Sequence, residues 1–330
     1  MMTIQEALIE ASSLLQEAGA ADGRHEAELL LLDLLGWDRT RLLLDGRDKA
    51  FPADLDAAWR ERLRRRCAGE PVQYIIGEQE FYGLPFEVNP AVLIPRPETE
   101  LLVEAIVKHA RQLWRADGEA VADTAGKADG TGTDRGGTSG TAVGTGGEST
   151  AVGGDSGGGR LLVDIGTGSG AIAVTAASQL PLWRVTACDL SADALAVAER
   201  NAMRNEVKDR MAFCQGDLLA PLLASGVTID VLVSNPPYIA SGDMPGLQRE
   251  VRDYEPVLAL DGGEDGLDLY RKLVQQIGEL PAAPRLVGFE VGMGQARDVA
   301  SMLEQTGLWQ HYEIVEDYAG IERHVLAWRE

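Results

Sequence analysis

The chain has 330 residues, of which 45% are hydrophobic and 25% charged, as in an ordinary soluble globular protein. Its formal net charge of −22 argues against a protein that coats nucleic acid, because phosphate binding depends on lysine and arginine. The three widely spaced cysteines predict neither a disulfide framework nor a zinc site. We find no signal peptide and no apolar run of membrane-spanning length, so we expect a cytoplasmic protein without a metal.

The first 75 residues predict a small helical domain. Thr3 and Glu6 are spaced for a capping box at the start of an amphipathic helix. A leucine-rich helix within 27–37 stops at a glycine, and a further helix begins near Pro52. The basic run at 60–67 is interpreted as a solvated helix face, with a local nucleic-acid contact as the alternative.

Residues 76–95 predict a β-hairpin linker, because two short β-prone runs flank the Gly83 region. A second, larger domain is expected over residues 96–330, starting with a helix whose first turn holds Pro97. Within it, residues 115–159 are rich in glycine and small polar residues. Such a segment cannot bury enough apolar area to become ordered, which predicts a disordered insert.

From residue 160 onward, short apolar strands alternate with helices. Strands are expected at 160–165, 183–189, 211–215, 229–234 and 285–291, and helices near 170–180, 191–205, 265–279 and 294–306. This pattern predicts an α/β fold with a doubly wound, mostly parallel sheet covered on both faces. Two strands within 312–328 would close it as an antiparallel edge pair, which makes a seven-stranded, Rossmann-like sheet.

A glycine-rich turn follows the first of these strands. Gly166, Gly168 and Gly170 alternate with Thr167 and Ser169 at the carboxyl end of that strand, where doubly wound folds bind ligands. The glycines would let a ligand approach the backbone closely.

Two acids follow the next two strands. Asp189 is placed to accept hydrogen bonds from two ribose hydroxyls, and Asp217 is a candidate partner for an adenine amino group. The G-x-G-x-G spacing after Asp164 resembles the first motif of S-adenosylmethionine-dependent methyltransferases. A nicotinamide cofactor is the alternative.

The fourth strand ends in an Asn-Pro-Pro-Tyr motif at 235–238. Asn235 and the carbonyl of Pro236 offer two acceptors, Pro237 makes the loop rigid, and Tyr238 offers a flat face. These groups fit a planar NH2 group. Holding both of its hydrogens favours the geometry of attack and stabilises positive charge that develops on nitrogen. The alternative is a turn that only ends a strand.

Transfer of a methyl group from a sulfonium to such a nitrogen depends on positioning the nitrogen more than on a general base, because the sulfonium is already a good leaving group. The four histidines, which we expect to be structural or surface residues, therefore need no catalytic role: His25, His109, His311 and His324.

The motif is shared by amino-methyltransferases that act on adenine N6, cytosine N4 or glutamine N5. Together with 69–104, 255–273 and 319–327, the chain resembles the protein-(glutamine-N5) methyltransferases of the HemK/PrmC family, which modify peptide chain release factors. The resemblance covers nearly the whole chain except 115–159. It implies that the helical domain recognises the substrate, and that 94–99 lies near the mouth of the site.

The family resemblance also implies the substrate, which is the glutamine of the Gly-Gly-Gln motif in class-1 release factors, and a role in tuning translation termination. Asn235, Pro236 and Tyr238 would be catalytic, and with Pro237 would bind the substrate amide. S-adenosylmethionine would be bound by Gly166, Thr167, Gly168, Ser169, Gly170, Asp189, Asp217, Leu218 and Asn235. We expect a monomer with no membrane or DNA contact.

Two features depart from the family pattern. Leu218 stands where an aromatic side chain is frequent, and the glycine-rich insert is not part of the usual plan. Three alternatives stay open: a ribosomal protein glutamine methyltransferase, a DNA adenine-N6 methyltransferase, and a binding protein without activity. The last would be expected to have lost Asp189 or Asn235, and both are present.

Overall fold

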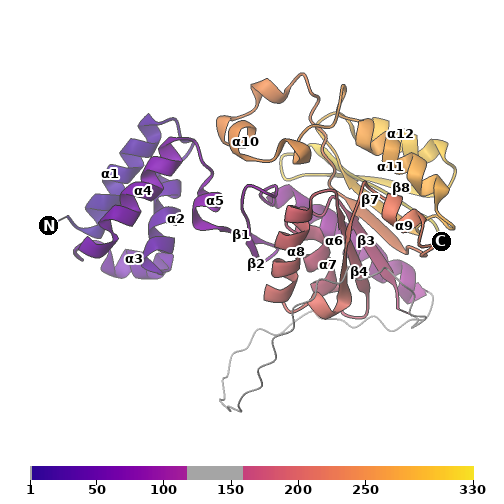
Figure 1. The fold of residues 1–330 in the computed structure, drawn as a ribbon, viewed down its shortest axis with the longest axis horizontal. Coiled ribbons are helices and arrows are strands. Elements are labelled where there is room, and N and C mark those ends of the chain that lie inside the picture. Colours follow the sequence, from indigo (N-terminus) through magenta and orange to yellow (C-terminus); the bar gives the residue numbers. More distant parts are fainter. Residues whose placement is uncertain (1, 117–158) are drawn as a thin grey trace, which may run out of the picture.

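The structure is a computed structural model that describes residues 2–116 and 159–330. Figure 1 shows a helical region at the N-terminal end and a larger α/β region that carries the C-terminus. Residues 117–158, which hold most of the predicted insert, lie outside the described residues. None of the described helices is long and apolar enough to cross a membrane.

The N-terminal region is helical, as predicted, and has a hydrophobic core of its own around Leu30, Leu31 and Trp59. The capping box is present, because the Thr3 side chain accepts from the Glu6 amide at 3.1 Å. The helices are α1 (Ile4–Glu17), α2 (Gly23–Leu35), α3 (Arg39–Asp45), α4 (Asp56–Cys67) and α5 (Val72–Ile76).

The basic run on α4 is only partly the solvated face that the sequence suggested. The Arg66 side chain is 7% exposed, and its guanidinium holds Glu26 of α2 at 2.7 Å and Glu250 at 2.6 Å. Arg60 and Arg64 do lie at the surface. The interpretation was wrong for Arg66 because its two acidic partners lie far away in the sequence.

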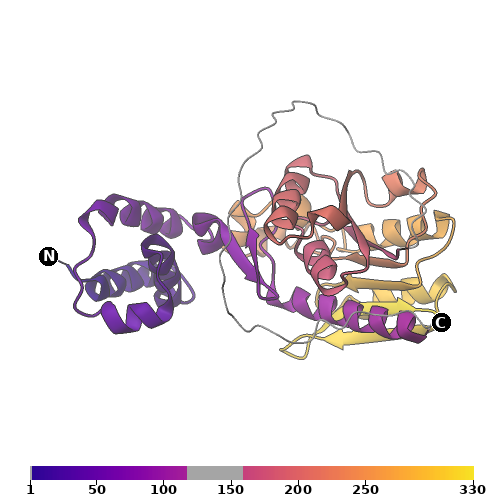
Figure 2. The same cartoon turned by 90° about the horizontal axis from the view of Figure 1, so that it is seen from below.

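The predicted hairpin consists of β1 (Glu78–Phe81) and β2 (Leu84–Glu87), which pair antiparallel. Its turn is shorter than the sequence suggested, since only Tyr82 and Gly83 connect the strands and Pro85 lies within β2. The chain then enters α6 (Pro97–Ala116), which lies against the sheet (Figure 2).

The predicted seven-stranded sheet is confirmed, with strand order β5-β4-β3-β6-β7-β9-β8. The first five strands in this order are parallel, and β9 lies antiparallel between β7 and the edge strand β8. The strands are β3 (Leu161–Ile165), β4 (Arg184–Asp189), β5 (Met211–Gln215), β6 (Val231–Ser234), β7 (Leu286–Glu290), β8 (His311–Glu316) and β9 (Glu322–Trp328).

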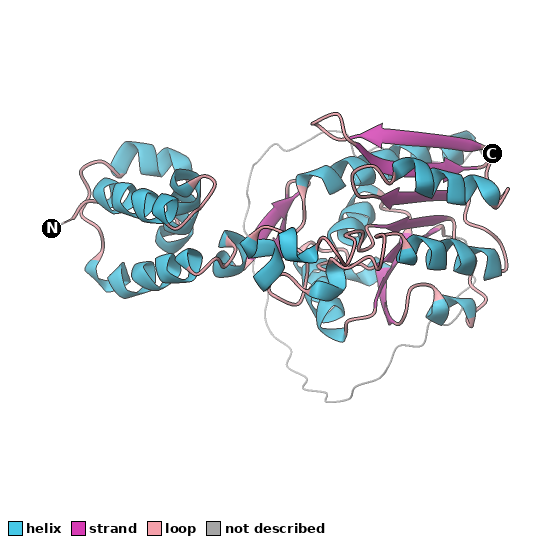
Figure 3. Ribbon diagram, turned by 90° about the horizontal axis from the view of Figure 1, so that it is seen from above, coloured by secondary structure: helices cyan, strands magenta, loops and turns pink. Residues whose placement is uncertain are grey.

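Helices cover both faces of the sheet (Figure 3). Alternation along β3 sends Leu162 to one core and Val163 to the other. The first core is covered by α6, α7 (Ala171–Gln179) and α8 (Ala192–Arg204). The second is covered by α9 (Ala220–Leu223), α11 (Asp268–Glu279) and α12 (Ala296–Gln305), while α10 (Arg249–Tyr254) lies in the long connection between β6 and β7.

The strand order reverses at β3, which has β4 on one side and β6 on the other. The loops that follow these strands therefore diverge and leave a crevice at the carboxyl edge of the sheet. Both sequence motifs lie in such loops, because one follows β3 and the other follows β6.

Candidate active site

The glycine turn after β3 opens onto a pocket. Gly166 and Gly168 have φ values of 70° and 55°, and a Cβ added at either would meet no protein atom within 4 Å. Gly170 differs, since its Cβ would lie 3.1 Å from Ala198 of α8. This glycine allows α7 and α8 to approach one another, and it does not line the pocket.

The buried Asp164 side chain, on β3, stabilises the glycine turn by hydrogen bonds. Its Oδ2 accepts from the Thr167 hydroxyl at 2.7 Å and from the Ala173 amide at 3.2 Å. Burial raises the pKa of Asp164 to about 7, and its hydrogen bonds to Thr167 and Ala173 oppose that rise. Asp164 thereby links the glycine turn to the start of α7 through these two hydrogen bonds.

Asp189 lies beside this turn at the end of β4. Its Oδ2 accepts from the Gly168 amide at 2.9 Å, and its Oδ1 accepts from the Ser191 amide at 2.8 Å. Burial raises the pKa of the Asp189 carboxyl, while these backbone bonds favour the charged form. A carboxylate has about four acceptor positions, so each oxygen keeps one for a ligand hydroxyl.

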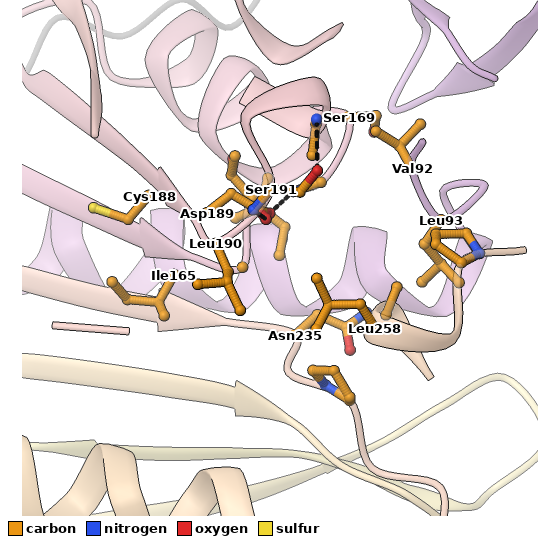
Figure 4. Close-up of a pocket in the computed structure, with 18 of the residues that line it drawn as sticks. Val92, Leu93, Ile165, Ser169, Cys188, Asp189, Leu190, Ser191, Asn235 and Leu258 are labelled. Carbon is orange, nitrogen blue, oxygen red and sulfur yellow. Dashed lines mark hydrogen bonds between the residues drawn. The ribbon is translucent and has the colours of Figure 1, made fainter. Parts of the chain in front are cut away.

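The pocket is built from loops at the carboxyl edge of the sheet and from the segment before α6. Figure 4 shows Asp189, Leu190 and Ser191 on one side of it and Asn235 and Leu258 on the other. Sequence reasoning missed most of the apolar lining, which no motif marks. The lining includes Val92, Leu93, Ile165, Ile172, Leu190, Leu218, Leu258, Ala259 and Leu269.

The two candidates after β5 also line the pocket. The Asp217 carboxylate forms an ion pair with Lys272 of α11, and both side chains are nearly half exposed. Leu218 has a φ of 53°, a left-handed conformation that costs roughly 1 kcal/mol in a residue with a Cβ. The contact of Asp217 with an adenine amino group stays a prediction.

The Asn-Pro-Pro-Tyr loop brings two of its four residues to the pocket. Asn235 and Pro237 line it, Pro236 is buried, and Tyr238 packs behind the loop against the core beside α11 and α12. The Tyr238 carbonyl accepts from Gln295 Nε2 at 3.0 Å. Burial raises the pKa of Tyr238 to about 12, so its hydroxyl stays neutral and cannot act as a base near neutral pH.

A buried polar group behind Asn235 was not predicted from the sequence. The Thr99 hydroxyl donates to Glu290 Oε2 at 2.7 Å, and Asn235 Nδ2 donates to Thr99 Oγ1 at 3.3 Å. His324 Nε2 lies 3.8 Å from Glu290 Oε2. Of the two earlier interpretations of His324, the surface one is wrong, because this side chain is fully buried.

Burial dominates the charge states in this group. It raises the pKa of Glu290 to about 7 and lowers that of His324 to about 4, so the imidazole is neutral at physiological pH. One signal could have found Glu290, because it is the only acid in the apolar run that ends β7.

These residues fit S-adenosylmethionine. The open space above Gly166 and Gly168 admits a ligand close to the backbone, and Asp189 keeps acceptors for ribose hydroxyls. The apolar side chains of Leu190 and Leu218 suit a purine ring. In the described ranges, no group of three or more His, Cys, Asp or Glu side chains is arranged to hold a metal ion.

Comparisons with known proteins give matches over both regions. A family model described as the PrmC N-terminal domain matches residues 6–77, and one described as the methyltransferase small domain matches residues 155–251. The chain is 38% identical to the release factor glutamine methyltransferase of Moorella thermoacetica, over 99% of each chain. It is 36% identical to that of Bacillus subtilis, over 99% of this chain and 98% of the relative, and 35% identical to that of Bacillus anthracis, over 99% of each.

Proposed function

Because the chain belongs to the release factor glutamine methyltransferase family, we propose that it methylates the side-chain amide nitrogen of the glutamine in the Gly-Gly-Gln motif of class-1 release factors, and so tunes translation termination. The chain is an S-adenosylmethionine-dependent methyltransferase. The observation that carries the proposal is Asn235, an amide on a rigid loop in the same pocket as Asp189. The proposal includes a monomeric enzyme that works in the cytoplasm with its protein substrate.

In this proposal the methyl donor is held by the turn of residues 166–169 and by Asp189, with Leu218 against its base. When bound, it supplies a methyl group on a positively charged sulfur, which is already a good leaving group. The protein therefore has to bring the acceptor nitrogen into line with that methyl group and keep it there.

In this proposal Asn235 Oδ1, which lines the pocket, accepts from one hydrogen of the substrate amide, and the carbonyl of the adjacent Pro236 accepts from the other; the contact with Pro236 stays a prediction, because that residue is buried and does not line the pocket. Neither oxygen accepts a hydrogen bond from the residues that the structure describes. An amide lone pair is delocalised, and binding both hydrogens in fixed directions favours the pyramidal nitrogen that can attack. As the N–C bond forms and the S–C bond breaks, these oxygens stabilise positive charge on nitrogen, which then loses one proton to solvent.

Pro237 and Tyr238 contribute rigidity in this account. Each proline restricts its own backbone and that of the residue before it, and the half-buried Tyr238 side chain packs against the core at the far end of the loop. A direct contact of Tyr238 with the plane of the substrate amide stays a prediction, because the ring does not line the pocket.

Transfer of labelled methyl groups tests the proposal. The protein is incubated with labelled S-adenosylmethionine and, separately, with a class-1 release factor, its Gly-Gly-Gln glutamine→Ala variant, a large-subunit ribosomal protein and DNA. We expect label on the intact release factor alone. Label on the ribosomal protein or on DNA, with none on the release factor, would contradict the proposal and favour one of the other two activities.

A further inference from the structure

Three side chains from distant parts of the sequence form one chain of hydrogen bonds behind the pocket. Glu290 ends β7, Thr99 lies in the first turn of α6, and Asn235 follows β6. Glu290 and Thr99 are 2% and 4% exposed, so water cannot readily replace either partner. Asn235 and Thr99 line the pocket, and Glu290 lies behind them.

We propose that Thr99 and Glu290 are positioning residues that fix the orientation of the Asn235 amide, with its nitrogen turned inward and its oxygen turned to the substrate. This inference rests on the proposed function, since it explains how that site presents an acceptor to an NH2 group.

The direction of each hydrogen bond follows from the one before. In its ionised form the Glu290 carboxylate only accepts, so in that form the Thr99 hydroxyl gives its proton to Glu290 Oε2. The Thr99 oxygen can then only accept from Asn235, which must present its NH2 group. A reversed amide would set the Asn235 oxygen against the Thr99 oxygen, two acceptors with no proton between them, in a buried place.

The surroundings hold Glu290 in place for this role. Tyr270 of α11 donates its hydroxyl to the Glu290 backbone carbonyl at 2.6 Å. In the sheet, Glu290 pairs directly with His324 of β9, whose neutral ring lies 3.8 Å from the carboxylate. The Glu290 carboxylate thus has fixed neighbours from α6 and β9, and its backbone is held by α11.

Side-chain amide resonances test the orientation without any substrate. The chain has four asparagines, so selective labelling with 15N-asparagine gives four side-chain NH2 signals. The Asn235 signal is identified by its loss in Asn235→Ala. Asn201 and Asn205, whose Nδ2 groups donate to Ser169 and Pro85 carbonyls at 2.8 Å and 3.0 Å, are internal references.

Thr99→Val removes the hydroxyl at nearly constant shape, and Thr99→Ser keeps it. We expect Thr99→Val to shift the Asn235 NH2 signal and speed its hydrogen exchange, and to leave the reference signals unchanged. Thr99→Ser should retain the signal of the parent protein. An Asn235 signal that does not change in Thr99→Val would overturn the inference, whatever the substrate proves to be.

The kinetic consequence is measured on the release factor. We expect Thr99→Val to lower kcat by about tenfold or more, to leave the dissociation constant of S-adenosylmethionine within about twofold, and to recover in Thr99→Ser. If Thr99→Val fails to fold, Glu290→Met removes the same acceptor from the other end, with the same expected loss. Equal kcat in the folded variant and the parent would refute the positioning role, whereas a parent that leaves the release factor unmethylated would refute only the proposed function.

Discussion

Two buried carboxyl groups lie on strands beneath the site, Asp164 on β3 and Glu290 on β7, and both are unusually easy to protonate. Burial raises the pKa of Asp164 to about 7 and that of Glu290 to about 7, from ordinary values of 3.8 and 4.5. Because the pKa of each acid is higher in the folded state than in the unfolded state, its protonated form stabilises the fold. This stabilisation is complete below pH ~4 and is lost as the pH rises through ~7. Ionising these acids therefore costs folding energy near neutral pH.

Asp164→Asn should remove part of this dependence. We expect the free energy of unfolding of the parent, minus that of the variant, to fall by about 3–4 kcal/mol between pH 4 and pH 8, since each pKa unit corresponds to about 1.4 kcal/mol. Urea denaturation at several pH values measures it. Asp193→Asn, an exposed carboxylate in the first turn of α8, is the matched control and should follow the parent. A constant difference for Asp164→Asn would show that folding does not shift the pKa of this acid.

Among individual residues, sequence patterns located the glycine turn and the position of Asp189, because each follows a recognisable strand. They did not reveal Glu290, Thr99 and His324 as one cluster. Thr99 and Glu290 are 191 positions apart, and they meet because α6 packs against β7. The left-handed backbone at Leu218 likewise has no signal in the residue type.

Among the elements, the segment of residues 260–267 supports the Asn-Pro-Pro-Tyr loop. Ile239 and Asp261 form a parallel bridge, in which the Ile239 amide donates to the Leu260 carbonyl at 3.0 Å and the Gly262 amide to the Ile239 carbonyl at 2.8 Å. Gly266 lies so close that an added Cβ would fall 2.3 Å from the Tyr238 carbonyl oxygen. The second motif is therefore rigid because of its partner segment as well as its prolines.

Gly266→Ala should disturb the loop. Its φ of 76° disfavours a side chain, and the Tyr238 carbonyl must move to admit one. We expect a loss of transfer of about tenfold or more with nearly unchanged binding of S-adenosylmethionine, because a small misplacement of a positioned group lowers the rate steeply. Transfer assays and calorimetric titration measure the two quantities.

Gly278→Ala is the control for this substitution. Gly278 lies within α11 and its Cβ would meet nothing within 4 Å, so the change should keep activity and stabilise the helix by about 1 kcal/mol. Activity of Gly266→Ala equal to that of Gly278→Ala would show that the segment 260–267 does not set the loop.

The order of helices and strands was predictable because apolar strands and amphipathic helices alternate clearly after residue 160. The place of the last two strands was predictable only in outline. Their antiparallel pairing at one edge was expected, but the pattern could not show that β9 enters between β7 and β8. That insertion puts His324 next to Glu290, and so it determines which buried side chains lie behind the site.

In the whole molecule, the helical region and the long connection between β6 and β7 are joined at one junction. Arg66 holds Glu250 of α10 at 2.6 Å, and the Tyr254 hydroxyl donates to the Ala68 carbonyl at 3.0 Å. The same connection runs on to Pro256, Leu258 and Ala259, which line the pocket. One connection therefore links the helical region to the wall of the pocket.

In the proposed mechanism Asn235 binds the substrate amide and has no large part in holding the methyl donor. Asn235→Ala tests it most directly, through the rate of methyl transfer to the release factor and the dissociation constant of S-adenosylmethionine measured on the same preparation. We predict that this constant stays within about threefold of the parent value, while transfer falls by about a hundredfold or more. Turnover at the parent rate in Asn235→Ala would contradict the account.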